Sequence, residues 1–208
     1  MTHNENPPRG HFIVLEGADG SGKTTQAALL ARALGAVLTR ESGGTDLGRA
    51  IRPLYLGEFD PTPVTEALLI GADRAQHIDE VVRPALERGQ NVVSDRHVAS
   101  TIAYQGAGRG VDRSLLDTIN NVATRGIKPD LVIVVVVSDA VSTRRVSDRG
   151  GLDRIEQQDD EFRRRVAQSY LDQASSDPTM KIVSGDGSIE EVASRIYDVV
   201  STYLARSA

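Results

Sequence analysis

The stretch GADGSGKT, at residues 17–24, determines the class of fold. It follows the apolar run 12–15, precedes a segment with a helical pattern, and fits the spacing of glycine, four residues and Gly-Lys-Thr. In this motif, glycines turn backbone N–H groups toward phosphate oxygens, and the following helix adds its positive N-terminal end. Lys23 is expected to reach the β and γ phosphates of a nucleotide, and the hydroxyl of Thr24 to hold Mg²⁺. The motif predicts a phosphate donor site but leaves the acceptor of the phosphate open.

Strand-like and helix-like segments alternate along the rest of the chain. The short apolar or β-branched runs that predict strands are 12–15, 36–39, 91–94, 131–137 and 181–183. Helical patterns lie at 22–34, 46–55, 63–88, 113–125, 140–147, 159–174 and 188–204. Pro84 is expected to bend or break the third of these helices. The alternation is typical of an α/β fold with a mostly parallel sheet covered on both faces. We expect a single domain at 11–208 after a flexible polar tail at 1–10.

Composition narrows the classes of partner. The chain has 208 residues, enough for one α/β domain, and a net charge of −5 with no long basic run. Binding to nucleic acid or to an anionic membrane is therefore not favoured. The absence of cysteine excludes disulfides and thiolate metal sites and is compatible with a reducing cytoplasm. The longest apolar run, 131–137, is too short to span a bilayer, and the N-terminus lacks the apolar segment of a signal peptide. We expect a cytoplasmic protein.

A second dense stretch, SDRHVASTIAYQGAGRG at residues 94–110, starts where the third predicted strand ends. Open parallel sheets bind ligands at that end. Asp95 is a candidate for Mg²⁺, directly or through water, and Arg96 for a phosphate held by two parallel hydrogen bonds. Taken alone, the pair is more typical of a surface ion pair. Its neighbours favour a nucleoside pocket, because they add hydroxyls, an aromatic ring and an amide: Ser100, Thr101, Tyr104 and Gln105.

Several charged residues outside the two motifs need an explanation. Phosphates would repel Asp19 inside the loop, so it is expected to accept from a sugar hydroxyl or to help order Mg²⁺, unless it is a solvated turn residue. Arg74 lies on the apolar side of its helix and needs a partner. Arg52 follows the turn that contains Glu41 and suits either a binding site or an exposed helix. His97 is expected to pack or cap rather than to catalyse.

The motifs together resemble the thymidylate kinases, which transfer the γ-phosphate of ATP to thymidine monophosphate. The matching stretches occur in the family's order and are FIVLEGADGSGKTTQ, TRESGGTDLGRAIR, TEALLIGADRAQH, VVSDRHVASTIAYQGAGRG, KPDLVIVV and LDRIEQQDDEFRRRV. The resemblance implies a P-loop three-layer sandwich, with a five-stranded parallel sheet flanked by helices and a short mobile lid at 147–158. It also implies ATP and thymidine monophosphate as partners, Mg²⁺ as cofactor and a homodimer.

The resemblance assigns roles to individual residues. The expected catalytic residues are Lys23, Asp19, Arg96, Arg149 and Arg154. The expected ATP-binding residues are Gly17, Ala18, Asp19, Gly20, Ser21, Gly22, Lys23, Thr24, Thr25 and Arg145. The expected acceptor-binding residues are Glu41, Arg52, Ile70, Arg74, Arg96, Ser100, Thr101, Tyr104 and Gln105. Arg145 resembles the arginine on the donor adenine, Arg74 the arginine at the thymine carbonyl, and Tyr104 the ring that crowds the 2′ position of the sugar. The metal would lie at Thr24 and Asp95.

Three positions distinguish this chain within the family it resembles. One branch of the family carries an arginine at the position of Gly20, whereas the other supplies arginines from the lid. Here the lid sequence DRGGLDRIEQ contains Arg149 and Arg154, although both also suit a solvated loop. Ser42 stands where proline is usual, and Ile70 where a phenylalanine usually stacks on thymine. Isoleucine lacks the aromatic geometry, which is worth about 0.5–1.5 kcal/mol, so thymine specificity stays open at this point.

Two other interpretations are compatible with the sequence. A P-loop kinase for another deoxynucleoside monophosphate would share every motif described above. A non-kinase P-loop ATPase or switch would need a water-positioning residue and nucleotide-dependent loops, and it would leave the polar lining at 95–105 without a purpose. Release of ADP with and without each deoxynucleoside monophosphate distinguishes these alternatives.

Overall fold

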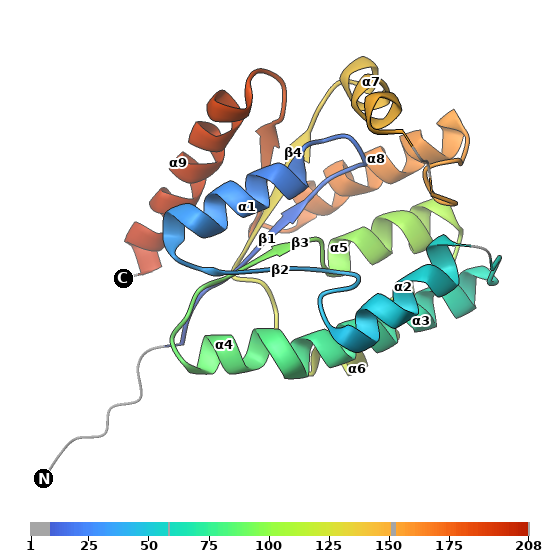
Figure 1. Ribbon diagram of the computed structural model, residues 1–208, viewed down its shortest axis with the longest axis horizontal. Helices are drawn as coiled ribbons and strands as arrows, with labels where there is room; N and C mark the ends of the chain where they lie inside the picture. The colour runs from blue at the N-terminus through green and yellow to red at the C-terminus, as the bar shows by residue number, and fades with distance from the viewer. Residues whose placement is uncertain (1–8, 58, 151–152, 208) are drawn as a thin grey trace, which may run out of the picture.

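The strands of the protein form one parallel sheet at its centre (Figure 1). The structure is a computed structural model that describes residues 9–57, 59–150 and 153–207. The strand order is β2-β3-β1-β4-β5, from β1 (Phe12–Glu16), β2 (Val37–Arg40), β3 (Val92–Asp95), β4 (Leu131–Val136) and β5 (Met180–Ser184). β1 pairs in parallel with β3 and β4 on either side. The predicted five-stranded parallel sheet is confirmed.

Helices cover both faces of this sheet and complete a three-layer sandwich (Figure 1). The α-helices are α1 (Lys23–Leu34), α2 (Asp46–Leu56), α3 (Pro63–His77), α4 (Arg83–Glu87), α5 (Val98–Thr101), α6 (Arg113–Thr124), α7 (Asp139–Arg149), α8 (Asp160–Ser176) and α9 (Ile189–Ser207). Two π-helical segments are η1 (Ile78–Val82) and η2 (Ile102–Gly108). α1 and α9 pack on the face that carries Ile13 and Leu15, while α4, α5 and α8 pack on the face of Phe12 and Val14.

The inner strands are buried on both faces, which explains their composition. All residues of β1 are buried, and β4 is buried through Val135. A strand covered on both sides has no polar face, so it shows a continuous apolar run instead of alternation. Glu16 is the exception within β1, because it is a fully buried carboxylate at the carboxyl end of the strand. That position lies directly beside the phosphate loop.

The long helical pattern at 63–88 is interrupted in the structure. α3 is followed by the π-helical segment η1 and then by α4, which contains Pro84 in its first turn. In a regular α-helix, the proline ring would collide with the carbonyl of Glu80, four residues earlier. A wider π-helical turn gives the ring room. The helical run therefore does not break at Pro84 but continues to Glu87, with the irregularity just before the proline.

The segment 98–108 is helical, although no helical pattern predicted it there. Gly106 and Gly108 lie within η2, and glycine disfavours helix. A Cβ at Gly108 would come within 2.5 Å of the ring of Phe162, so glycine lets α8 pack closely on this segment. Tertiary packing overrides local propensity here, and it carries the polar lining at 100–105 into the interior.

Two residues before the predicted domain boundary, Arg9 and Gly10, contact the rest of the domain. Arg9 forms an ion pair with Asp130 at 2.8 Å, and the backbone N–H of Gly10 donates to the carbonyl of Leu86 at 3.0 Å. Arg9 and Gly10 thus belong to the domain, and residues 1–8 of the predicted tail lie outside the described residues. Every helix in the described ranges is too short or too polar to cross a membrane.

Candidate active site

The predicted phosphate loop connects β1 to α1, and its shape depends on glycine. Gly17, Gly20 and Gly22 have φ angles of 142°, 77° and 89°, which side chains rarely adopt. A Cβ at Gly17 would lie 2.4 Å from the carbonyl oxygen of Val135, and one at Gly20 would lie 2.6 Å from that of Ser142. The loop is therefore held closely between β4 and α7. A side chain at position 20 would require α7 to shift.

Lys23 and Thr24 lie in the first turn of α1, at the mouth of this loop. The Lys23 side chain is buried, and its Nζ donates to the carbonyl of Ala18 at 3.3 Å and lies 3.8 Å from a carboxylate oxygen of Asp19. Burial lowers the pKa of Lys23, and the nearby charge of Arg96 lowers it further, against the opposing effect of the acids around it. The phosphate loop therefore holds the ammonium group of Lys23 in a fixed position.

Thr24 and Asp95 form a pair of oxygen ligands beside Lys23. The hydroxyl of Thr24 donates to Oδ2 of Asp95 at 2.5 Å. Oδ1 of Asp95 is buried and has no hydrogen-bond partner within the described chain. No cluster of three or more His, Cys, Asp or Glu side chains among the described residues could hold a metal ion by itself. Mg²⁺ is usually held by one or two protein oxygens together with phosphates and water, so this pair fits Mg²⁺.

Arg96 connects the phosphate loop to the acceptor stretch. It lies just after β3 with φ at 74°, an unusual conformation for a non-glycine residue that often marks a functional position. Its Nη2 bonds Oδ1 of Asp19 at 2.6 Å and the hydroxyl of Tyr104 at 3.2 Å. The Tyr104 hydroxyl in turn donates to Oδ2 of Asp19 at 2.7 Å. In this arrangement Asp19 faces a guanidinium group, which removes the electrostatic objection to a carboxylate in the loop.

The other side of Arg96 is held by Ser100, which was predicted to bind the acceptor, and by Tyr170, which was not predicted. Its Nη1 donates to Ser100 Oγ at 2.9 Å and to the hydroxyl of Tyr170 at 3.0 Å. Both hydroxyls also donate to Glu16, at 2.6 and 3.3 Å. Burial raises the pKa of Glu16, although the charge of Arg96 and several hydrogen bonds oppose the shift. Glu16 could have been recognised as a site residue from the sequence, because a charged residue at the end of an apolar strand is unusual. No sequence pattern marked Tyr170.

The predicted acceptor residues meet around a small cavity of about 90 Å³. The cavity lies between α2, α3, α5 and η2, next to the Asp19–Arg96 pair. All of the residues predicted to bind the acceptor line it: Glu41, Arg52, Ile70, Arg74, Arg96, Ser100, Thr101, Tyr104 and Gln105. Arg52 donates to the carbonyl of Ser42 at 3.1 Å. Gln105 donates to Glu66 at 2.7 Å, and Glu66 was not recognised from the sequence.

Glu41 is the centre of a buried polar cluster below this cavity. Its Oε2 accepts from Arg74 Nε at 2.7 Å, and its Oε1 lies 2.8 Å from His77 Nδ1 and 2.9 Å from His97 Nδ1. Burial alone would raise the pKa of Glu41, but His97 and Arg74 hold the pKa well below its usual value of 4.5. Arg74 also donates to Thr101 Oγ1 at 3.0 Å. The cluster fixes Arg74, and it gives His97 the packing role predicted from the sequence.

The substitution Glu41→Gln is expected to destabilise the protein by about 3 kcal/mol at pH 7, because it leaves a buried arginine without its counter-ion. The lowered pKa makes this contribution complete above pH 4.5 and weaker as the pH falls through the folded-state pKa. Denaturant unfolding of both proteins should therefore show a difference that shrinks below pH 4.5. Glu87→Gln, at an exposed position, is the control and should show no such difference. A constant difference across this range would contradict the assignment.

The arginines of α7 and the predicted lid occupy different sites. Arg145 Nη1 donates to the carbonyls of Gly20 and Ser21, at 3.4 and 3.3 Å, and so lies along the phosphate loop. Arg154 does not contact that loop but donates to Glu66 and, at 2.6 Å, to Asp60. In this structure, the buried carboxylate of Glu66 thus holds Arg154, and the role of Arg154 at the transferring phosphate stays a prediction. The side chain of Arg149 lies outside the described residues.

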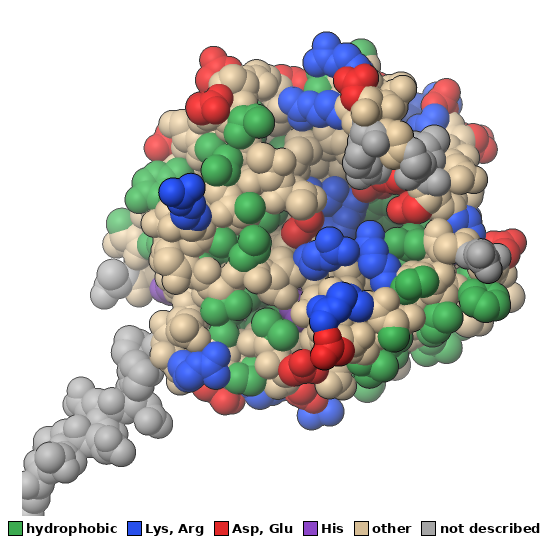
Figure 2. All heavy atoms as spheres, viewed as in Figure 1, with side chains coloured by type: hydrophobic (Ala, Val, Ile, Leu, Met, Phe, Trp, Pro, Cys, Tyr) green, Lys and Arg blue, Asp and Glu red, His purple; other side chains and the backbone are tan. Residues whose placement is uncertain are grey.

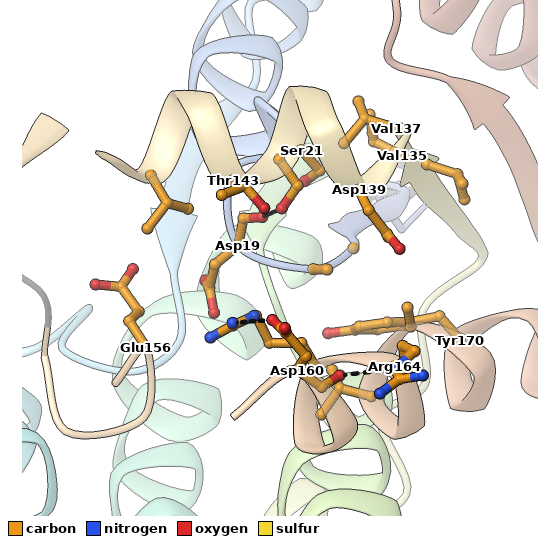
Figure 3. A pocket seen from close by; sticks show the side chains of 18 of the residues that line it. Asp19, Ser21, Val135, Val137, Asp139, Thr143, Glu156, Asp160, Arg164 and Tyr170 are labelled. Atoms are coloured by element: carbon orange, nitrogen blue, oxygen red, sulfur yellow. Dashed lines mark hydrogen bonds and ion pairs between the residues drawn. The ribbon is translucent and has the colours of Figure 1, made fainter. Parts of the chain in front are cut away.

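A larger hollow of about 1140 Å³ lies between α7 and α8. Figure 3 shows it with Asp19 at its inner edge and with Asp160, Arg164 and Tyr170 on the α8 side. Glu156, from the segment between the two helices, also lines it. On the face of the molecule shown in Figure 2, basic side chains gather around a central hollow. Such a concentration of positive charge suits phosphate-bearing ligands.

Comparisons with known proteins agree with this geometry. The family model described as thymidylate kinase matches residues 15–196. The chain is 44% identical over 205 residues to a thymidylate kinase of Nostoc sp., covering 94% of this chain and 97% of the relative. It is 45% identical over 194 residues to a thymidylate kinase of Leifsonia xyli, covering 90% and 92%. The crystal structure of a thymidylate kinase from Ehrlichia chaffeensis superimposes with a TM-score of 0.77 at 33% identity, covering 93% of this chain and 99% of that one. The chain belongs to the thymidylate kinase family.

Proposed function

We propose that the protein transfers the γ-phosphate of ATP to thymidine monophosphate, yielding ADP and thymidine diphosphate. The observation that carries this proposal is the position of Arg96, which bonds Asp19 of the phosphate loop while lining the acceptor cavity. One guanidinium group thus lies between the sites for donor and acceptor. A phosphotransferase needs this adjacency, because its transition state contains both nucleotides in line. A P-loop ATPase or switch would not need the acceptor cavity.

The donor phosphates would be held by the loop at residues 17–24 and the N-terminus of α1. Backbone N–H groups there would bind phosphate oxygens, and Lys23 would neutralise charge that develops during transfer. Arg145 would pack on the adenine. Thr24 and Asp95 would hold Mg²⁺, whose bound form supplies charge neutralisation between phosphate oxygens. The hydrogen bond from Thr24 to Asp95, which brings the two oxygens together, supports this assignment.

The acceptor nucleotide would occupy the cavity beside Arg96. Arg96 would bind its phosphate through a forked pair of hydrogen bonds. Arg74, held by Glu41 and Thr101, would contact the thymine carbonyl. Tyr104 is fixed by Asp19 and would crowd the 2′ position of the sugar, which favours deoxyribose. Hydrogen-bond donors that are fixed in this way discriminate strongly between bases, because a base without the matching acceptor leaves them unpaired.

The proposal is tested by measuring ADP formation with Mg²⁺, ATP and each deoxynucleoside monophosphate separately. Thymidine monophosphate should give the highest kcat/KM, and the diphosphate should accumulate in step with ADP. A higher kcat/KM for another monophosphate would overturn the thymine specificity but not the kinase assignment. ADP formation that is independent of any acceptor would overturn both.

Ile70→Phe tests whether the base lies against α3. Ile70 is half-buried, lines the cavity and packs on the main core. If there is room for the ring, stacking should tighten binding of thymidine monophosphate by at most about 1.5 kcal/mol, or roughly tenfold. In a filled pocket the larger ring should weaken binding, since overpacking costs about 1–3 kcal/mol. Titration calorimetry on Ile70→Phe, Ile70→Ala, Arg74→Ala and the double variants measures this. Unchanged affinity in Ile70→Ala with strict additivity to Arg74→Ala would place the base elsewhere.

We also propose a homodimer located in the cytoplasm. Large apolar side chains are exposed on three neighbouring helices, α2, α3 and α6, and they are Leu47, Leu54, Val64, Leu68, Leu115 and Val122. Apolar groups that gather on one side of a molecule favour association. Sedimentation velocity should give twice the chain mass of 22.4 kDa. A monomer at micromolar concentration would overturn this proposal without affecting the assigned reaction.

A further inference from the structure

Glu66 on α3 is fully buried and has no role in the reaction as described so far. Its Oε1 accepts from Gln105 Nε2 at 2.7 Å, and the Nε of Arg109 lies 3.6 Å from the same oxygen. Its Oε2 accepts from Nη2 of Arg154. One carboxylate therefore contacts three side chains: Gln105 and Arg109, in η2 and at its end, and Arg154 in the segment between α7 and α8.

Arg154 attaches the covering segment, residues 153–158, to the wall of the acceptor cavity. Its Nε donates to the carbonyl of Tyr55 at 3.0 Å and its Nη1 to Asp60 at 2.6 Å. The Asp60 side chain is 88% exposed, whereas that of Glu66 is 1% exposed. Exposed ion pairs contribute little to stability, while a buried carboxylate depends on its cation. The pair with Glu66 is therefore the stronger attachment.

The covering segment closes a cavity that is too small for the acceptor. Asp153 and Ile155 line the cavity of about 90 Å³, whereas pockets for ligands of nucleotide size usually measure about 300 Å³ or more. On its other side, Ile155 and Glu156 line the hollow of about 1140 Å³ (Figure 3). The covering segment therefore lies between the acceptor cavity and the larger hollow. Movement of this segment toward the larger hollow would enlarge the acceptor cavity, and it would separate Arg154 from Glu66.

Arg109 is placed to take over the carboxylate when Arg154 leaves. A buried carboxylate without a cation is strongly unfavourable, so opening would be suppressed if Glu66 had no second partner. The Nε and Nη2 of Arg109 are buried and make no hydrogen bond within the described chain. Its guanidinium lies over the ring of Phe162, 5.2 Å from the ring centre, and so it is held close to Glu66. A small movement would bring these free donors onto Oε1.

We propose that Glu66 is a positioning residue that couples closure of the covering segment to the orientation of Gln105, with Arg109 replacing Arg154 when the segment opens. This proposal rests on the function proposed above. Closure through Arg154 would fix Gln105 on the same carboxylate that holds the segment. Return of Arg154 to Glu66 over a bound acceptor would set the amide for the base, which couples acceptor recognition to exclusion of water.

Glu66→Gln removes the charge while keeping the shape of the side chain. We expect kcat/KM for thymidine monophosphate to fall by roughly 10- to 100-fold, as for a reacting group that is slightly misplaced, mainly through a higher KM. Amide hydrogen exchange in residues 153–158 of the free protein should become about tenfold faster or more, the factor for losing one hydrogen bond to a charged group. Exchange in β1 should not change. Asp60→Asn, which removes the exposed partner of the same arginine, is the matched control and should change neither quantity more than about twofold.

Arg154→Met breaks the same pair from the other side and should also accelerate exchange in the covering segment, which keeps the test valid if Glu66→Gln does not fold. Arg109→Met should have the opposite effect, because opening would then leave Glu66 without a cation, so exchange at 153–158 should slow. Unchanged exchange in both Glu66→Gln and Arg154→Met would overturn the positioning role. Unchanged or faster exchange in Arg109→Met would overturn the replacement of partners. Exchange is measured without substrate, so these outcomes are separate from a failure of the wild-type protein to phosphorylate any acceptor.

Discussion

Arg96→Ala should lower kcat/KM for thymidine monophosphate by at least about 10³-fold, the range known for a single arginine that stabilises phosphoryl transfer. The side chain lies between the phosphate loop and the acceptor cavity, where it bonds Asp19, Ser100, Tyr104 and Tyr170. Its removal takes away both the ligand of the acceptor phosphate and the positive charge beside the transferring group. Acceptor affinity measured by calorimetry should therefore fall together with kcat.

The backbone conformation at this position provides a control for the Arg96 prediction. Because φ is 74°, alanine is strained there, whereas glycine is not. Arg96→Gly should be more stable than Arg96→Ala but equally inactive if the side chain carries the effect. Arg113→Ala, at an exposed arginine of α6, should retain full activity. Near-normal kcat/KM in Arg96→Gly would refute the role assigned to the guanidinium group.

Lys23→Ala should lower kcat by about 10²–10³-fold, as does the loss of one preorganised donor to a developing charge. The ammonium group is buried beside the loop, 3.3 Å from the carbonyl of Ala18, and little solvent screens its charge. Acceptor affinity should change far less than kcat, because Lys23 belongs to the donor site. This separates Lys23→Ala from Arg96→Ala, which should affect both quantities.

Stability measurements distinguish a catalytic effect of Lys23 from a structural one. Burial lowers the pKa of Lys23, which means that the folded protein holds its charge at a cost. Lys23→Ala should therefore leave the free energy of unfolding nearly unchanged or slightly increased. Lys181→Ala, at an exposed position of β5, is the matched control. If Lys23→Ala kept wild-type kcat, transfer would not depend on the phosphate loop as proposed.

Local patterns were sufficient to locate the strands and the phosphate loop. Apolar or β-branched runs predicted each strand to within one or two residues. The signal was clearest for β1 and β4, because a strand buried on both faces tends to be continuously apolar. The loop could be placed because its glycines adopt φ angles that other residues avoid. The helical segment 98–108 was not predicted, because Gly106 and Gly108 disfavour helix. The two glycines allow close packing instead, Gly106 against Leu116 of α6 and Gly108 against Phe162 of α8.

The contacts among the polar groups of the candidate site could not be predicted from sequence patterns. Sequence and family resemblance named Asp19, Arg96 and Tyr104, but only the folded chain shows that the three bond one another over as many as 85 residues of separation. Glu66 had no visible signal, because a lone glutamate in a helix is usually solvated.

Residue patterns alone predicted the class of fold, the donor loop and the types of residue available for an acceptor, since these depend on periodicity and on backbone conformations that a few residue types allow. The strand order, the pairing of Arg96 with Asp19 and the attachment of Arg154 to Glu66 became visible only in the folded chain. The physical reason is that buried charges must find partners. The partner of a buried charge is chosen by distance in the folded chain, and no local pattern encodes that distance.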